Sequence, residues 1–190
     1  TSINPTHAPE SIIWCSDPSN VIKECPTVGL PGDYFYSPMR IGERWDPYTE
    51  RICSIDPSGR GSDETAAAYI SQHNGLLYLH EMRAYRDGYS DKTLLDILRG
   101  CKKFNVSTLL IETNFGDGIV AELFNKHLQQ TRQNIYIEEV RANVRKEDRI
   151  IDALEPVLNQ HRLVVDRGVI DWDFKSNPDA PPEERLLYML

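Results

Sequence analysis

Two acidic residues stand where a predicted strand gives way to a glycine-rich loop. Asp56 follows the largely apolar segment 52–55, and Glu112 follows the apolar segment 106–111. Carboxylates at strand ends are suited to hard divalent cations, which prefer oxygen ligands. Two such ions about 4 Å apart can activate a water molecule and stabilise the leaving oxygen when a phosphodiester is cleaved. The alternative for Asp56 is a local role, in which it caps its own turn.

The loop after Asp56 carries two further charged side chains. Arg60 lies between two glycines and could contact a phosphate through charge-assisted, bidentate hydrogen bonds. Glycine admits the backbone angles that such a tight loop requires. Asp63 closes the loop, and an aspartate in that position commonly bonds its own backbone.

The densest basic cluster lies further along the chain, in and before a predicted helix. Contact with a nucleic-acid backbone is one interpretation of this cluster. The other is a solvated helix face on which the basic residues pair with acidic neighbours. The cluster consists of Arg141, Arg145, Lys146 and Arg149.

The elements that must position these residues follow a regular order from Arg51 onward. Three strands are followed by helix, strand, helix, strand and helix, and Ser90 is the expected cap of the first helix. The hairpins and helical crossovers predict an α/β fold with a mixed sheet, antiparallel first and parallel afterwards, with helices on its faces. The predicted strands are 52–56, 64–72, 76–85, 106–111, 135–140 and 163–165, and later helices are predicted at 119–130 and 146–160. In such a sheet, Asp56 and Glu112 share one rim if their strands are parallel neighbours.

Composition predicts one soluble globular domain with an additional arm. Residues 1–50 are rich in proline and are predicted to be an irregular linker or arm, whereas 51–190 form the domain. Asp171 and Asp173 flank Trp172 in a further predicted strand. The four cysteines form no CxxC pair, which favours reduced thiols over a zinc site. No apolar run reaches the roughly 18 residues of a membrane span, and no signal peptide is evident.

The formal net charge of −8 limits the ways in which the chain could meet nucleic acid. Autonomous, high-affinity binders usually have a basic surface, because most of their affinity comes from contacts with phosphates. An enzyme that meets nucleic acid locally remains compatible with this charge. Tethering to a domain that holds the substrate would supply the missing effective concentration.

Three segments resemble, in order, the nuclease domain of the large terminase subunit of T7-like tailed bacteriophages. They are residues 54–66, 109–118 and 145–158. The order of strands and helices is similar to that of the RNase H-like nuclease fold. The resemblance extends over about residues 53–165.

The resemblance implies a metal-dependent endonuclease that cuts concatemeric double-stranded DNA with two Mg²⁺ or Mn²⁺ ions. Asp56 and Glu112 match the catalytic acids that bind metal, and Asp63 matches an aspartate near the metals. A third catalytic acid is expected beyond Leu190, with Asp148 or Asp152 as the fallback, so the activity of this fragment alone is an open question.

The family resemblance also implies partners and a location. The chain has no G-x-x-x-x-G-K-[ST] loop, so an upstream ATPase motor domain of the same polypeptide is expected. The portal protein and the small terminase subunit are the other expected partners. The expected location is the host cytoplasm, at the prohead.

Two other functions fit parts of the pattern. An actin-like or sugar-kinase-like nucleotide-binding domain shares this sheet order and also opens with an aspartate and a glycine turn. Such a domain needs a second phosphate loop and a larger chain, whereas a nuclease needs the carboxylate of Glu112. The other alternative is a non-catalytic interaction module that contributes only surface to a packaging assembly.

Overall fold

A computed structural model describes residues 2–23, 34–57, 64–113, 118–141 and 146–176, with residues 179 and 181. Within these residues the largest sheet has six strands in the order β10-β7-β6-β5-β8-β9. Their bounds are β5 Glu50–Asp56, β6 Thr65–His73, β7 Leu76–Tyr85, β8 Thr108–Glu112, β9 Tyr136–Val140 and β10 Leu163–Val165.

The strand directions follow from the lengths of the connections. β5, β6 and β7 are antiparallel, whereas β8 is parallel to β5, β9 is parallel to β8, and β10 is parallel to β7. The β6–β7 hairpin turns at Asn74 and Gly75, whose φ angles of 47° and 76° suit a tight hairpin. The predicted mixed sheet, antiparallel first and then parallel, is therefore confirmed.

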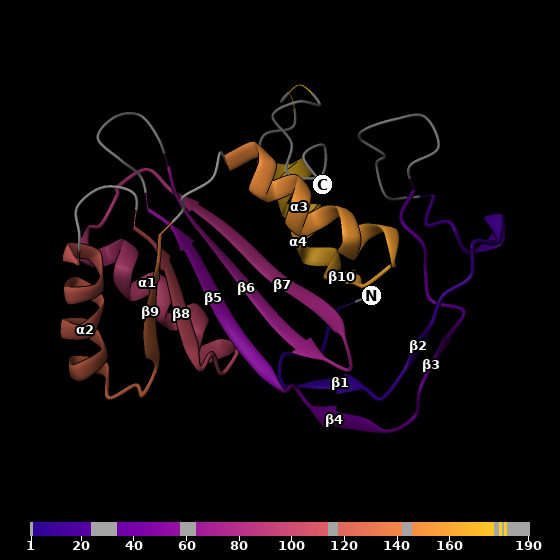
Figure 1. The fold of residues 1–190 in the computed structure, drawn as a ribbon, viewed down its shortest axis with the longest axis horizontal. Helices are drawn as coiled ribbons and strands as arrows, with labels where there is room; N and C mark the ends of the chain where they lie inside the picture. The colour runs from indigo at the N-terminus through magenta and orange to yellow at the C-terminus, as the bar shows by residue number, and fades with distance from the viewer. Residues whose placement is uncertain are drawn as a thin grey trace.

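Four helices accompany the sheet in the described part of the chain. They are α1 (Asp91–Lys103), α2 (Ile119–Thr131), α3 (Lys146–Asn159) and α4 (Arg167–Ser176). Figure 1 shows α1 and α2 together beside β8 and β9, and α3 and α4 together beside β7 and β10. The Ser90 side chain accepts a hydrogen bond from the Thr93 amide, so the predicted cap of α1 is confirmed.

The main core lies where α1 and α2 pack against β5, β6 and β8. The aromatic ring of Tyr69 is fully buried there, and its hydroxyl donates to the Ile97 carbonyl at 3.0 Å. A Cβ atom at Gly100 would lie 2.2 Å from that hydroxyl oxygen, so α1 needs glycine at this point to approach the sheet. This close packing fixes the sheet from which the loops extend.

A β-bulge interrupts the pairing of β6 with β7. Tyr69 pairs with Glu81 and Ile70 pairs with Leu79, which leaves His80 as an extra residue. A bulge changes the direction of side chains in its strand. His80 and Glu81 consequently both lie on the α1 side, where they contact Phe104 and Lys103.

The N-terminal region contains short paired strands rather than wholly irregular chain. β1 (His7–Pro9) pairs with β4 (Trp45–Pro47), and β2 (Ile12–Ile13) pairs with β3 (Arg40–Ile41). A short 3₁₀ helix, η1, covers Pro18–Asn20. The region is joined to the domain by hydrogen bonds, including one from the Asn74 side-chain amide to the Glu10 carbonyl at 2.9 Å. The division into 1–50 and 51–190 stays a prediction.

One predicted strand is wrong. The segment with Asp171, Trp172 and Asp173 belongs to α4, not to a strand. Asp171 pairs with Arg167 at 3.1 Å and with Lys175 at 3.7 Å, each four residues away, and this spacing stabilises a helix. No helix among the described residues is long and apolar enough to cross a membrane.

Candidate metal centre

Asp56 and Glu112 lie on one rim of the sheet. Asp56 ends β5 and Glu112 ends β8, and these two strands are parallel neighbours. Ile55 pairs with Ile111, so the two acidic residues that follow them stand at the same level. Both are half-buried. The predicted sharing of one rim is confirmed, whereas their role as metal ligands and catalytic acids stays a prediction.

The flanking sequence explains how these residues reach the rim. The segments before them supply fully or nearly fully buried side chains, Cys53 and Ile55 in β5 and Leu109 and Ile111 in β8. Burial of these residues fixes the register of both strands, because a slip by one residue would turn every side chain to the opposite face. The carboxylates therefore sit at the ends of two firmly held strands.

Arg149 approaches the rim from the first turn of α3. Its Nη2 atom donates to Glu112 Oε1 at 2.9 Å, across 37 positions of sequence. The Arg149 side chain is 31% exposed and that of Glu112 is 19% exposed, so this ion pair is partly withdrawn from solvent. The sequence predicted contact with DNA or a pair within the helix for Arg149, and it did not predict this long-range pair.

Tyr89 shows that the negative charge of Asp56 acts on its surroundings. Burial raises the pKa of the Tyr89 phenol, and the nearby charge of Asp56 raises it further. The rim thus carries two carboxylates and one guanidinium in a region that is partly shielded from water. In such a region, electrostatic interactions are stronger than at a fully exposed surface.

Several predicted site residues fall outside the described part of the chain. Asp63, Arg60 and Arg145 lie outside the described residues, and so does the side chain of Lys146, although its backbone begins α3. The fallback ligands Asp148 and Asp152 are exposed on α3. Among the residues that the structure describes, no group of three or more His, Cys, Asp or Glu residues could hold a metal ion.

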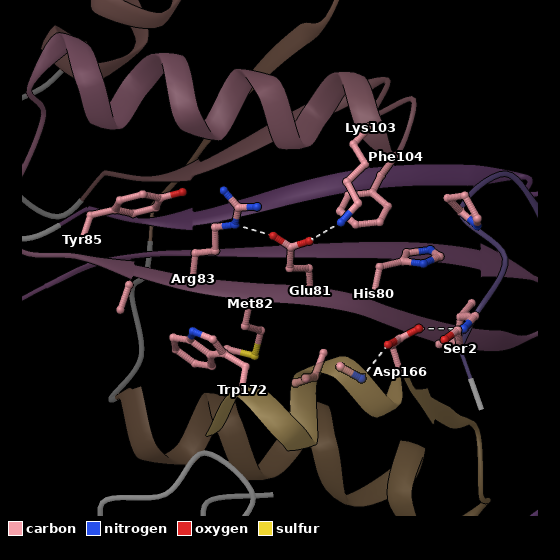
Figure 2. A pocket seen from close by; sticks show the side chains of 15 residues that line it. Ser2, His80, Glu81, Met82, Arg83, Tyr85, Lys103, Phe104, Asp166 and Trp172 are labelled. Atoms are coloured by element: carbon pink, nitrogen blue, oxygen red, sulfur yellow. Dashed lines mark hydrogen bonds and ion pairs between the residues drawn. The ribbon is translucent and has the colours of Figure 1, made fainter. Parts of the chain in front are cut away.

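A concave region lies at β7, away from the rim. It is a cavity of about 600 Å³ whose lining includes His80, Glu81, Arg83, Lys103 and Trp172. Figure 2 shows Glu81 between Arg83 and Lys103 on one side of β7, with Met82 and Trp172 on the other. Two cations, Arg83 and Lys103, balance the charge of the Glu81 carboxylate, and this distinguishes the cavity from the rim.

His80 in this cavity was not singled out from the sequence. Its ring stacks on Phe104 with 5.0 Å between the ring centroids, and its Nε2 atom lies 2.9 Å from the Ser71 hydroxyl. Burial lowers the pKa of His80 to about 4. The adjacent polar pair His80 and Glu81 in the middle of a strand was the available signal, because it breaks the alternation expected of β7.

The donor chemistry of the rim suits a divalent cation. Asp56 and Glu112 supply carboxylate oxygens, the hard ligands that Mg²⁺ and Mn²⁺ take. They come from neighbouring strand ends, where two charges of the same sign gain from a cation between them. The rim residues that the structure describes therefore fit a metal, and Asp56 and Glu112 would be two of its acidic ligands.

Comparison with known proteins points in the same direction. The family model of the terminase of bacteriophage T7, ribonuclease H-like domain, matches residues 55–163. The large terminase subunit of Enterobacteria phage T3 is 40% identical over 183 residues, which cover 96% of this chain. This chain spans 31% of the length of that relative.

A solved structure shares the fold at low sequence identity. The human cytomegalovirus terminase nuclease domain, soaked with Mn and bound to an inhibitor, aligns with a TM-score of 0.50 and 10% identity. The alignment covers 71% of this chain and 75% of that domain. The Mn-soaked form without the inhibitor gives the same TM-score at 9% identity. None of these comparisons favours the actin-like or sugar-kinase-like alternative.

Proposed function

We propose, because the chain belongs to the family of ribonuclease H-like domains of T7-type phage terminases, that it is a metal-dependent endonuclease. Its substrate would be concatemeric double-stranded DNA, cut during packaging of the phage genome. The 40% identity to the phage T3 large terminase subunit supports this role. The observation that carries the proposal is the meeting of Asp56 and Glu112 at the ends of two parallel strands.

Asp56 and Glu112 would hold two Mg²⁺ or Mn²⁺ ions, and Asp63 would stand near them. The Mn-soaked terminase nuclease domain of human cytomegalovirus supports the choice of a divalent metal. When bound, such ions supply an activated water molecule and stabilise charge on the leaving oxygen. The contribution of the protein is to fix the two carboxylates on rigid strand ends, so that they do not reorganise during the reaction.

Basic side chains would position the DNA backbone at this rim. Arg149 already lies beside Glu112, and Arg60, Arg145 and Lys146 are the other proposed phosphate contacts. A guanidinium can bond a phosphate through two parallel N–H groups, which fixes orientation as well as distance. Such contacts carry no base preference, because phosphates are the same in every sequence.

The remaining members of the packaging machinery are also part of the proposal. An ATPase motor domain of the same polypeptide would hold the DNA, which compensates for the formal net charge of −8 on this chain. The portal protein and the small terminase subunit would be further partners. The site of action would be the host cytoplasm.

Digestion of plasmid DNA, by this chain and by a version extended past Leu190, tests the proposed function. We expect cleavage with Mn²⁺ and none with EDTA, and we expect Asp56→Asn and Glu112→Gln to abolish it. Glu155→Gln is the matched control, because it removes an exposed carboxylate from α3 that is not among the candidate ligands. Cleavage that survives both rim substitutions would contradict the proposal. If the version extended past Leu190 folds and binds DNA but does not cut it under any metal condition, the non-catalytic interaction module is favoured instead.

A further inference from the structure

Arg149 holds one carboxylate oxygen of Glu112 at the rim. The guanidinium donates to Oε1 at 2.9 Å from the first turn of α3. A divalent ion bound between Asp56 and Glu112 would need carboxylate oxygens of the same two residues. A cation fixed to one of these oxygens therefore competes with the metal, both for the lone pairs and through charge repulsion.

The Arg149 guanidinium is incompletely bonded in this position. Its Nε atom is buried and has no hydrogen-bond partner among the residues that the structure describes. A buried donor without a partner costs free energy, and this cost is recovered when the group moves to a fuller set of acceptors. A phosphate offers such a set, since its oxygens can accept two N–H groups of one guanidinium.

The helix that carries Arg149 is loosely held. From Asp148 to Asn159 every side chain of α3 is exposed or half-buried, and Ile150 and Ile151 are 41% and 56% exposed. By contrast, α1 contributes several side chains that are at most 1% exposed, including Leu94 and Ile97. Elements with few buried apolar side chains move at low cost. A small shift of the first turn of α3 would withdraw Arg149 from Glu112.

We propose that Arg149 is a displaceable counter-ion that holds Glu112 until metal and DNA arrive together. This inference rests on the proposed function, because it requires that Asp56 and Glu112 bind the metal. Without DNA, Arg149 balances the charge of Glu112 and weakens metal binding. A DNA phosphate that accepts Arg149 releases Glu112 to the metal. Binding couplings are reciprocal, so metal binding also releases Arg149 toward the phosphate.

The affinity of the full chain for Mn²⁺, measured by calorimetry without DNA, tests the inference. We expect Arg149→Gln to lower the dissociation constant roughly tenfold, within the 5- to 150-fold range of typical couplings between sites. Arg149→Lys keeps a positive charge and should stay closer to wild type. Arg167→Gln is the matched control, because it removes an arginine that pairs with a carboxylate on α4. It should leave the dissociation constant unchanged.

The possible outcomes separate this inference from the proposed function. Equal or weaker Mn²⁺ binding by Arg149→Gln overturns the inference, provided that melting in EDTA shows a folded protein. If Arg149→Gln melts early, Mn²⁺ binding is compared between Arg149→Lys and wild type instead. Tighter Mn²⁺ binding by wild type than by Arg149→Lys then overturns the inference. If Glu112→Gln abolishes Mn²⁺ binding and Arg149→Gln leaves it unaltered, the proposed metal site stands. Only the counter-ion role of Arg149 is then overturned. Absence of Mn²⁺ binding in every variant overturns both proposals.

Discussion

Two glutamates of the same sheet pair with arginine, and their surroundings differ. Glu81 on β7 lies between Arg83, two residues away, and Lys103 at 2.7 Å from the end of α1. Arg83 in turn bonds Asp96, which also accepts from the Tyr85 hydroxyl at 2.8 Å. Glu112 on β8 instead stands beside Asp56 and pairs with Arg149 from the loosely held α3.

The difference separates a structural carboxylate from a candidate ligand. At β7 each acid is balanced by cations from elements that the core fixes, so the network there stabilises the fold. At the rim two carboxylates are neighbours, and a divalent cation between them would be attracted by both charges. Substitutions at β7 should therefore lower the free energy of unfolding, whereas substitutions at the rim should affect metal binding and leave the fold intact.

The largest expected loss of stability comes from removing the aromatic ring of Phe104, which packs against β7. Phe104 is 5% exposed and packs against His80 and Tyr69, with 5.2 Å between its ring centroid and that of Tyr69. Phe104→Ala should lower the free energy of unfolding by about 3–4 kcal/mol, because it removes a buried ring and leaves a cavity. Urea denaturation measures the loss. Ile119→Ala, at a position 58% exposed, should change it by less than about 0.5 kcal/mol.

The next effect is a pH dependence that originates at His80. Burial lowers the pKa of His80 to about 4, so the folded protein binds this proton less readily than the unfolded chain. The contribution to stability is complete above the ordinary pKa of about 6.5 and is lost as pH falls from there to about 4. Chemical denaturation across this window should show a loss of about 2–3 kcal/mol attributable to His80.

His80→Gln provides the comparison for this pH dependence. The amide can still bond the Ser71 hydroxyl but does not titrate in this range. Carboxylates titrate in both proteins, so the difference between the two curves isolates the histidine. If the free energies of unfolding of wild type and His80→Gln changed in parallel between pH 6.5 and 4, His80 would take up its proton equally in the folded and unfolded states.

Breaking the Glu81 network should have a smaller effect. Glu81→Gln keeps the shape of the side chain but removes the charge that balances Arg83 and Lys103. We expect a loss of about 1–2 kcal/mol in the free energy of unfolding, because Arg83 is partly buried. Glu64→Gln is the matched control, since Glu64 pairs with the largely exposed Arg86. Its expected cost is below about 1 kcal/mol, and equal losses in both variants would contradict the distinction.

The sequence predicted the sheet well because its strands carry local signals. The apolar run of residues 66–70 and the Asn74–Gly75 turn indicate the hairpin without distant information. The start of β8 was placed two residues too early, at Val106. Val106 is buried, but its amide bonds the Cys101 carbonyl in the turn after α1, so its apolar character reflects packing rather than a strand.

The features that sequence reasoning missed depend on tertiary contacts. The Arg149–Glu112 pair joins residues 37 positions apart, and no local pattern encodes it. The α4 helix was mistaken for a strand because Asp171, Trp172 and Asp173 alternate over too short a segment. The spacing of Arg167, Asp171 and Lys175 was the better signal, since charges four residues apart pair on a helix.

The smallest expected change in stability is at the rim, and it decides between two roles for Asp56. If Asp56 mainly caps its own turn, Asp56→Asn should keep most of that hydrogen bonding, whereas Asp56→Ala should cost about 1 kcal/mol. If Asp56 is a ligand beside Glu112, both variants in EDTA should stay within about 0.5 kcal/mol of wild type or become slightly more stable, because repulsion is relieved. Thermal melting in EDTA measures this difference.

The same melting experiment with Mn²⁺ completes the argument about Asp56. At 100 times its dissociation constant, a metal that binds the folded state stabilises it by about 2.7 kcal/mol. Wild type should gain this stability, and both Asp56 variants should lose most of the gain. Glu81→Gln should keep it in full, because that carboxylate lies in the compensated network at β7. If Asp56→Ala lost stability in EDTA yet kept the full gain from Mn²⁺, Asp56 would be a structural residue like Glu81.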